Sequence, residues 1–231
     1  ILGYFTVWQG PENNVCDSLN IQKRNEVLIG WSKDGFHWNR ENKKPFLPVS
    51  EDFHAWNAGN VQSTAGSPLI VGDSLYFYVS GRYNSKPKHD SNFATGLAML
   101  RRDGFVSMRA GRKEGYIEIK TQIPANGNYL FVNADVKGTL AVEVLDDNGQ
   151  PMEGFTKKDC ISMKKSDKTK QMISWEKHPG VTSLVGKTVR LKFYLNQADI
   201  YAFWISAWQT GESGGYTGGG GPGLSDKGID T

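Results

Sequence analysis

Apolar and polar residues alternate along several short segments of the chain. Between residues 189 and 195, apolar side chains stand at every odd position, with Arg190, Lys192 and Tyr194 between them. Successive side chains of a strand point to opposite faces of a sheet, so this period of two predicts a strand with one buried face. Residues 140–145 repeat the pattern. The Asn-Gly pair at 148–149 then predicts a hairpin turn, because both residues tolerate positive φ.

Short runs of β-branched and aromatic residues, bounded by Gly, Pro, Asn or Asp, predict the other strands. No segment has the period of a long helix, and a short helical turn is expected only near Thr182–Val185. The predicted strands are Gly3–Gln9, Glu26–Trp31, Pro68–Val71, Ser74–Arg82, Ala94–Leu100, Tyr116–Lys120, Asn128–Asp135, Thr139–Leu145, Lys170–Trp175, Thr188–Leu195 and Ile200–Ile205. The sequence therefore predicts an all-β protein.

One strand-and-turn unit occurs twice. Residues 31–36 and residues 100–105 both run from a strand into an Asp-Gly turn followed by Phe, so Asp34 and Asp103 are expected to form turns. Repetition of a hairpin unit is typical of propeller blades. Coincidence is the alternative, because Asp-Gly is a very common hairpin signal. The similar flanking strands favour repetition.

Composition narrows the class of protein. A net charge of +3 is too small to indicate a nucleic-acid partner, and the Lys-rich stretch 164–170 is expected to be a solvated strand edge. No apolar run is long enough to span a bilayer. Cys16 and Cys160 are interpreted as two separate thiols rather than a disulfide. The scattered histidines and cysteines form no metal-ligand motif, so neither a metal nor a cofactor is predicted.

The character of the chain changes after Phe105, and we place a domain boundary within residues 106–115. This gives a first domain over 1–108, a second over 109–208 and a Gly-rich tail over 209–231. Glycine tracts bury little surface, so the tail is expected either to be mobile or to lie along the protein as a strap. The chain opens inside an apparent strand, without Met or a signal peptide. We therefore expect it to be the C-terminal part of a longer protein.

Residues 29–38 resemble the strand-turn signature S-x-D-G-x-x-W of five-bladed propeller glycosidases, the relatives of invertases, arabinanases and neoagaro-oligosaccharide hydrolases. Residues 45–47 and 67–78 fit the same pattern. Segments between 130 and 206 resemble the C-terminal sandwich of bacterial family-32-like glycosyl hydrolases. The resemblance implies the last blades of a five-bladed β-propeller followed by a β-sandwich, with the first blades upstream.

The resemblance also implies a secreted or periplasmic glycoside hydrolase that acts on a plant or algal polysaccharide. Hydrolysis needs two carboxyl groups, one of which the family usually supplies from the first blade. A non-catalytic carbohydrate-binding or extracellular structural protein on the same scaffold is the alternative. A third hypothesis is a subunit whose missing half is another polypeptide.

The loop 51–62 is the most suggestive segment, because it gathers carboxylates, amides, His and Trp without alternation. The catalytic candidates are Glu51 and Asp52, together with Asp17 from a separate polar segment. The candidates for binding sugar are His54, Trp56, Asn57 and Gln62. In the relatives an acidic residue often stands where Asn57 stands, and this difference favours binding over cleavage.

Alternatives remain at each of these positions. In a second interpretation Trp56 fills the interface between two blades and Asn57–Gly59 is a simple turn. Asp17 is also interpretable as a residue of a solvent-exposed loop. Arg82 and Tyr83 are candidates for binding a carboxylate or sulfate of an acidic sugar, or for an ion pair at a blade edge. The three tryptophans of a further possible sugar platform are Trp175, Trp204 and Trp208.

Overall fold

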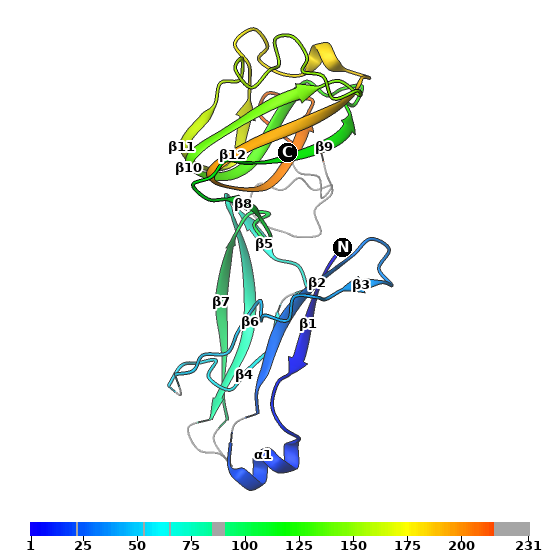
Figure 1. Cartoon of the computed structure of the whole chain (residues 1–231). Helices are drawn as coiled ribbons and strands as arrows, with labels where there is room; N and C mark the ends of the chain where they lie inside the picture. The colour runs from blue at the N-terminus through cyan, green and yellow to red at the C-terminus, as the bar shows by residue number, and fades with distance from the viewer. Residues whose placement is uncertain (22, 53, 65, 85–90, 215–231) are drawn as a thin grey trace. The chain divides into compact units, whose positions relative to one another are not determined.

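The computed structural model (Figure 1) describes the chain except for residues 22, 53, 65, 85–90 and 215–231. In the described residues most elements are strands, which confirms the all-β class. The chain forms two compact units, residues 1–69 with 76–99 and residues 70–75 with 100–231. The domain ranges predicted from the sequence stay a prediction. No helix in the described part of the chain has the length and apolar character needed to cross a membrane.

The strands of the first unit belong to one seven-stranded sheet, in which two groups are distinguished. One group contains β1 (Leu2–Trp8), β2 (Asn25–Ser32) and β3 (Trp38–Asn39), paired antiparallel. In the other group β4 (Asn60–Thr64) pairs antiparallel with β6 (Ser74–Asn84), and β5 (Leu69–Val71) and β7 (Ser91–Arg101) also pair with β6. Most of β5 belongs to the second unit. In the described residues a single parallel pair, Asn25 with Asn60, joins the two groups.

An aromatic cluster fills the core between these groups. The rings of Tyr4 and Phe46 stack with centroids 5.7 Å apart. Both meet the ring of Phe77 edge to face, at 5.7 Å and 5.5 Å. Burial of Tyr4 raises the pKa of its hydroxyl above the ordinary value. These contacts fix β1, the segment around Phe46 and β6 relative to one another.

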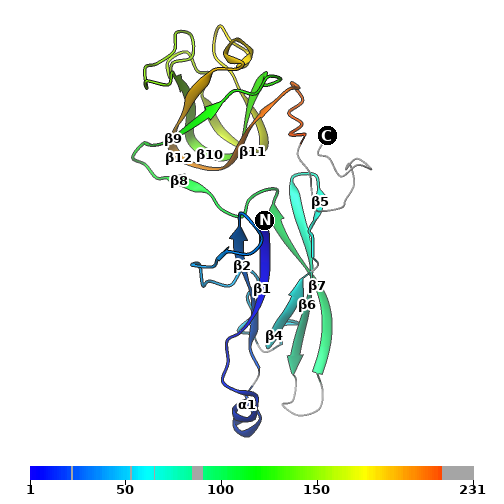
Figure 2. The same cartoon turned by 90° about the vertical axis from the view of Figure 1, so that its right-hand side faces the viewer.

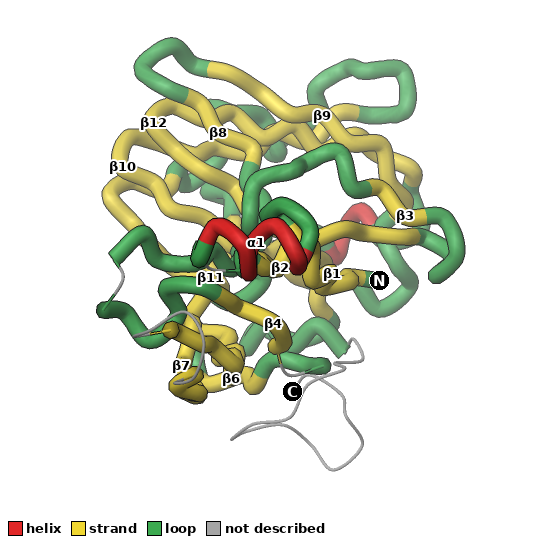
Figure 3. The backbone as a smooth tube through the Cα atoms, turned by 90° about the horizontal axis from the view of Figure 1, so that it is seen from below, coloured by secondary structure: helices red, strands yellow, loops and turns green. Residues whose placement is uncertain are grey.

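The second unit is one sheet that curls into a half-barrel (Figure 2). Its strands are β8 (Met108–Ala110), β9 (Gly115–Gln122), β10 (Tyr129–Leu145), β11 (Met163–Ile173) and β12 (Thr188–Ser206). β10 lies between β11 and β12, while β9 and β8 pair with successive parts of β12, as Figure 3 also shows. A bulge between Val136 and Thr139 bends β10, as bulges do.

The buried face of this sheet follows the predicted alternation. Val189, Leu191 and Phe193 are each at most 1% exposed. Trp175 lies in the same core, where its indole Nε1 donates to the carbonyl of Val142 at 3.0 Å. The predicted strands 128–135 and 139–145 are one continuous strand, β10, and the last two predicted strands are likewise joined as β12. The predicted breaks are therefore bends within long strands.

Several local predictions are confirmed. Both cysteines are buried thiols without a disulfide. The helical turn near 182 is the 3₁₀ helix η1 (Thr182–Leu184). The Lys-rich strand β11 is an edge strand of the described sheet, with its lysines exposed. Asp34 forms the expected turn, because its Oδ1 accepts from the amides of Phe36 and His37 at 2.9 Å and 2.8 Å. The hydrogen bond from the His37 ring and these amides hold the pKa of Asp34 well below its usual range.

Other expectations need correction. Asp17 lies on the short helix α1 (Asn13–Leu19, red in Figure 3), where an irregular loop was expected. The two Asp-Gly turns also lead to different partners. After Asp34 the chain pairs back onto β2 through β3, but after Asp103 it continues to β8, which pairs with β12. The second turn is therefore not a hairpin.

Truncation of Leu191 tests the assignment of the buried face. Leu191→Ala removes a fully buried side chain and leaves a cavity, so we expect it to lower the free energy of unfolding of the second unit by about 2–5 kcal/mol. Ile161→Ala is the matched control, because Ile161 is 58% exposed and its truncation is expected to cost less than about 1 kcal/mol. Urea unfolding followed by circular dichroism measures both. Equal losses would contradict the assignment.

Candidate functional site

Residues 48–59 form a closed loop between the end of the first strand group and β4. The Ser50 amide donates to the carbonyl of Asn57 at 3.2 Å, and the Asn57 side-chain amide donates to the carbonyl of Pro48 at 3.2 Å. The far end is fixed to β6, because the Gly59 amide donates to the carbonyl of Arg82 at 3.1 Å. We call this segment the 48–59 loop. It carries five of the residues that the sequence singled out.

A buried carboxylate lies beneath the loop. Glu26, on β2, has a side chain that is only 4% exposed. Its Oε1 accepts from the Val49 amide at 3.2 Å and from the Arg24 guanidinium at 3.1 Å. A carboxylate removed from water needs such partners. Glu26 therefore anchors the start of the loop to β2.

Arg24 connects this buried carboxylate with one of the predicted catalytic residues. Its second terminal nitrogen donates to Glu51 Oε1 at 2.8 Å, and the Glu51 side chain is 82% exposed. Hydrogen bonds to Glu51 and then to Glu26 raise the pKa of Arg24 above its ordinary value. We call Arg24, Glu26 and Glu51 the Arg24 cluster. In this cluster one guanidinium bonds both carboxylates.

Trp56 lies against the backbone of the neighbouring strands. A Cβ atom placed on Gly81 of β6 would be 2.4 Å from the Trp56 ring, and one placed on Gly96 of β7 would be 2.3 Å from it. Only glycine leaves room for the indole at these two positions. Trp56 is nevertheless 37% exposed. It packs on β6 and β7 and still presents part of its ring to solvent.

The other loop candidates are polar and close in sequence to this ring. Asp52 and His54 are exposed, and Asp52 Oδ1 accepts from the His54 amide at 2.9 Å. The Asn57 side-chain amide shapes the loop through its bond to Pro48. Gln62 belongs to β4 rather than to the loop, and its carbonyl accepts from the Thr6 hydroxyl. The structure thus gathers Glu51, Asp52, His54, Trp56 and Asn57 on one loop.

Three predicted residues lie elsewhere. Asp17 is exposed on α1, and within the described residues no hydrogen bond or ion pair ties it to Glu51 or Asp52. Side chains alternate along β6, so Arg82 points to the face opposite Gly81 and Trp56. Its guanidinium lies 4.6 Å from the centre of the exposed Phe93 ring. The Tyr83 side chain lies outside the described residues.

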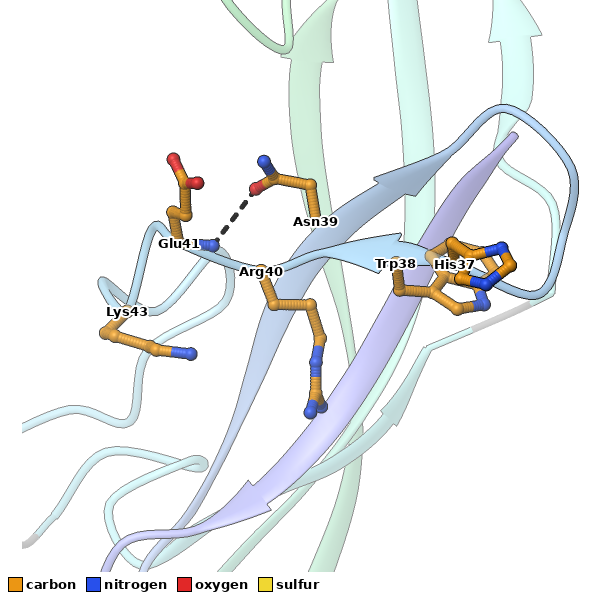
Figure 4. Close-up of a pocket in the computed structure, with 6 residues that line it drawn as sticks. All are labelled: His37, Trp38, Asn39, Arg40, Glu41 and Lys43. Carbon is orange, nitrogen blue, oxygen red and sulfur yellow. Dashed lines mark hydrogen bonds between the residues drawn. The ribbon is translucent and has the colours of Figure 1, made fainter.

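A hollow of the first unit, about 670 Å³ in volume, lies beside β3 (Figure 4). Trp38 forms part of its wall and packs on its own hairpin, with Nε1 donating to the Gly35 carbonyl at 3.0 Å. Arg40 covers the Phe5 ring at 5.0 Å. Figure 4 shows Arg40, Glu41 and Lys43 pointing in different directions. These charged groups do not converge on one point, so the hollow offers no arrangement for catalysis.

The three tryptophans of the second unit do not form the platform considered from the sequence. Trp175 is buried in the core. Trp204 is partly buried and stacks on Phe131, with ring centroids 5.6 Å apart. Trp208 is 53% exposed. Within the described residues, no group of three or more His, Cys, Asp or Glu side chains is placed to hold a metal ion.

The chemistry of the site follows from these contacts. One guanidinium joins Glu26 and Glu51, so the two carboxylates lie near each other, as a hydrolytic pair does. The Glu26 side chain is only 4% exposed and is bonded to Arg24 and Val49, however, so it is not open to a substrate. The site is therefore suited to hydrogen bonding and aromatic stacking. Sequence reasoning missed Arg24 and Glu26, whose only signal was a charged pair at the start of a strand.

Replacing Glu26 and Glu51 by alanine, one at a time, tests their different roles in the loop. Glu26→Ala leaves the Val49 amide and part of Arg24 without an acceptor in a buried place, so we expect it to reduce the free energy of unfolding by about 2–4 kcal/mol. Glu51→Ala removes an exposed ion pair and is expected to cost less than about 1 kcal/mol. Urea unfolding followed by tryptophan fluorescence measures both. A loss in Glu51→Ala as large as that in Glu26→Ala would refute this division of roles.

Comparison of the chain with protein-family models, with curated proteins and with solved structures finds no match in any of the three. The fold and the 48–59 loop are therefore interpreted from their own geometry and chemistry.

Proposed function

We propose that this chain binds carbohydrate through the 48–59 loop. The observation that carries the proposal is the Trp56 ring, which rests against Gly81 and Gly96 and remains 37% exposed. The C–H groups of a sugar ring pack well on such an aromatic surface. Asp52 and His54, both exposed on the same loop, supply hydrogen-bonding groups for sugar hydroxyls.

We also propose a scaffold of propeller blades followed by a β-sandwich. The antiparallel pairing within each strand group of the first unit supports this assignment, because propeller blades are small antiparallel sheets. The Asp34 turn belongs to the segment that resembles propeller glycosidases, and Asp34 there accepts from the amides of Phe36 and His37. A secreted or periplasmic bacterial protein is the setting that this assignment implies.

Binding is favoured over hydrolysis by the contacts of the loop. The hydrolase hypothesis assigns acid–base roles to Glu51 and Asp52, with a further carboxyl group from upstream blades. Glu51 is paired with Arg24 at 2.8 Å, and the Glu26 carboxylate that shares this arginine is only 4% exposed, so the two do not face a substrate together. Asn57 has no acidic proton to offer, and its amide is bonded to Pro48. Both observations support a non-catalytic carbohydrate-binding role.

Replacement of Trp56 tests the proposed binding surface. Affinity electrophoresis against arabinan, agarose, inulin and pectin gives the retardation of the wild-type chain on each polysaccharide. We expect Trp56→Ala to weaken binding to the retained polysaccharide on the order of tenfold, because the stacking surface is lost. Trp31→Ala is the control, since Trp31 is also exposed but lies on β2 outside the loop. Unchanged affinity in Trp56→Ala would exclude the loop as the binding surface.

Release of reducing sugar from the same polysaccharides separates binding from hydrolysis. We expect no release by the wild-type chain above the level of Glu51→Gln, because the Glu26 carboxylate that shares Arg24 with Glu51 is buried and does not face a substrate. Time courses with both proteins at equal concentration provide the comparison. Release that depends on Glu51 would reject the binding role and favour a glycoside hydrolase.

A further inference from the structure

The second unit contains a cavity that the 48–59 loop does not share. It has a volume of about 250 Å³, and all of its lining residues belong to the second unit. Three segments wall it: the turn at Asp73, the turn at Arg102 and Asp103, and the chain around Gly211. Lys170 of β11 and Trp204 of β12 complete the lining. Segments far apart in the sequence thus meet around one hollow.

Hydrogen bonds tie the first two walls to each other and to the sheet. The Thr169 hydroxyl of β11 donates to the Asp73 carboxylate. The Arg102 amide donates to the carbonyl of Asp73 at 2.8 Å, and the buried Asn133 of β10 donates to the carbonyl of Arg102 at 2.6 Å. Each turn is therefore held at two points.

Arg101 strengthens the same attachment. Its Nε donates to Asn133 Oδ1 at 2.6 Å, and one terminal nitrogen donates to the Ala134 carbonyl at 3.2 Å. The other terminal nitrogen forms an ion pair with Asp167 of β11. The turn that carries Arg102 and Asp103 is thus fixed before any ligand arrives. Walls that are fixed in advance lower the entropic cost of binding.

The third wall is the described beginning of the Gly-rich tail. Trp204 Nε1 donates to the carbonyl of Gly211 at 3.0 Å, and the Ser206 hydroxyl donates to the carbonyl of Glu212 at 2.7 Å. Gly211 has a φ of +83°, and a Cβ atom there would be 2.8 Å from the Phe131 ring. Glycine is therefore required at this point of the wall. The rest of the predicted tail, residues 215–231, lies outside the described residues.

The lining decides the kind of ligand. Asp73 and Asp103 balance Arg102 and Lys170, so the cavity offers strong donors and acceptors without a net charge. Such a lining suits hydroxyl groups better than it suits a phosphate, a sulfate or a cation. The Trp204 indole adds an aromatic wall for C–H groups. Pockets of roughly 300–1,000 Å³ hold drug-sized ligands, so this smaller cavity fits a single sugar ring.

We propose that this cavity is a second carbohydrate site, which binds one neutral monosaccharide residue. The choice of a sugar as the ligand rests on the proposed carbohydrate-binding function. The site itself rests on the fixed walls, the balanced charges and the Trp204 ring.

Ligand titration of the full chain tests this proposal. Saturation-transfer NMR and calorimetry with D-glucose, D-galactose, L-arabinose and D-fructose, and with D-glucuronate as the charged comparison, identify the sugars that bind. We expect at least one neutral sugar to bind at millimolar concentration. Asp73→Asn and Lys170→Gln each remove a charged partner of the hydroxyls and are expected to weaken that binding about tenfold. Asp73→Asn keeps an oxygen that can accept from Thr169.

Lys164→Gln is the matched control, since Lys164 is an exposed lysine of the same strand outside the cavity. It is expected to bind the sugar within twofold of the wild type, and so is Trp56→Ala. If no neutral sugar binds, or if Asp73→Asn and Lys170→Gln bind as tightly as Lys164→Gln, the cavity proposal is overturned. The Trp56-dependent retardation on polysaccharide is measured separately, so it reports on the proposed function whatever happens at the cavity. Stronger binding of glucuronate than of every neutral sugar would also overturn the proposal.

Discussion

The antiparallel pairing of β10 with β12 is the interaction on which the second unit depends. It runs from Tyr129 opposite Ser206 to Leu145 opposite Arg190, and every other described strand of the half-barrel sheet pairs with one of these two. One face of the pair supplies the apolar core. The other face carries Asn133 and Trp204, to which the cavity walls are attached. The packed core and the proposed sugar site thus both depend on the pairing of β10 with β12.

The first unit depends on its aromatic cluster and also on polar contacts. Its two strand groups share a single parallel pair in the described residues, so the long connection between them needs other supports. Glu26 provides one support, because its buried carboxylate needs its hydrogen bonds to Val49 and Arg24. The support has a chemical consequence. Because Glu26 is buried beneath the loop, it does not face a substrate together with Glu51.

The sequence was informative where a rule acts over a few neighbouring residues. Alternation identified both faces of β12, and the Asp34 turn followed from its local hydrogen bonds. It failed for β3, which is only two residues long, and for α1, a seven-residue helix without a side-chain cap. The single bent strand β10 was divided in two, because a bulge interrupts the alternation just as a loop does.

The functional sites were harder to predict than the strands. The loop residues Trp56 and Glu51 stand out by composition, and the structure places them together. Their supports do not stand out, because Glu26 meets Val49, and Trp56 meets Gly81 and Gly96, only after the chain has folded. The cavity of the second unit depends on contacts such as that between Asp73 and Thr169, which no local pattern contains.

The lysines of β11 give this edge strand a further property. A strand at the edge of a sheet offers backbone groups to which another chain can add, and closely spaced positive charges oppose such addition through mutual repulsion. Lys164, Lys165, Lys168 and Lys170 therefore protect the sheet from self-association as fibrils or swapped dimers. Lys170 also lines the cavity. Evolution of the cavity toward a different ligand is thus constrained by the need to keep the protein from aggregating.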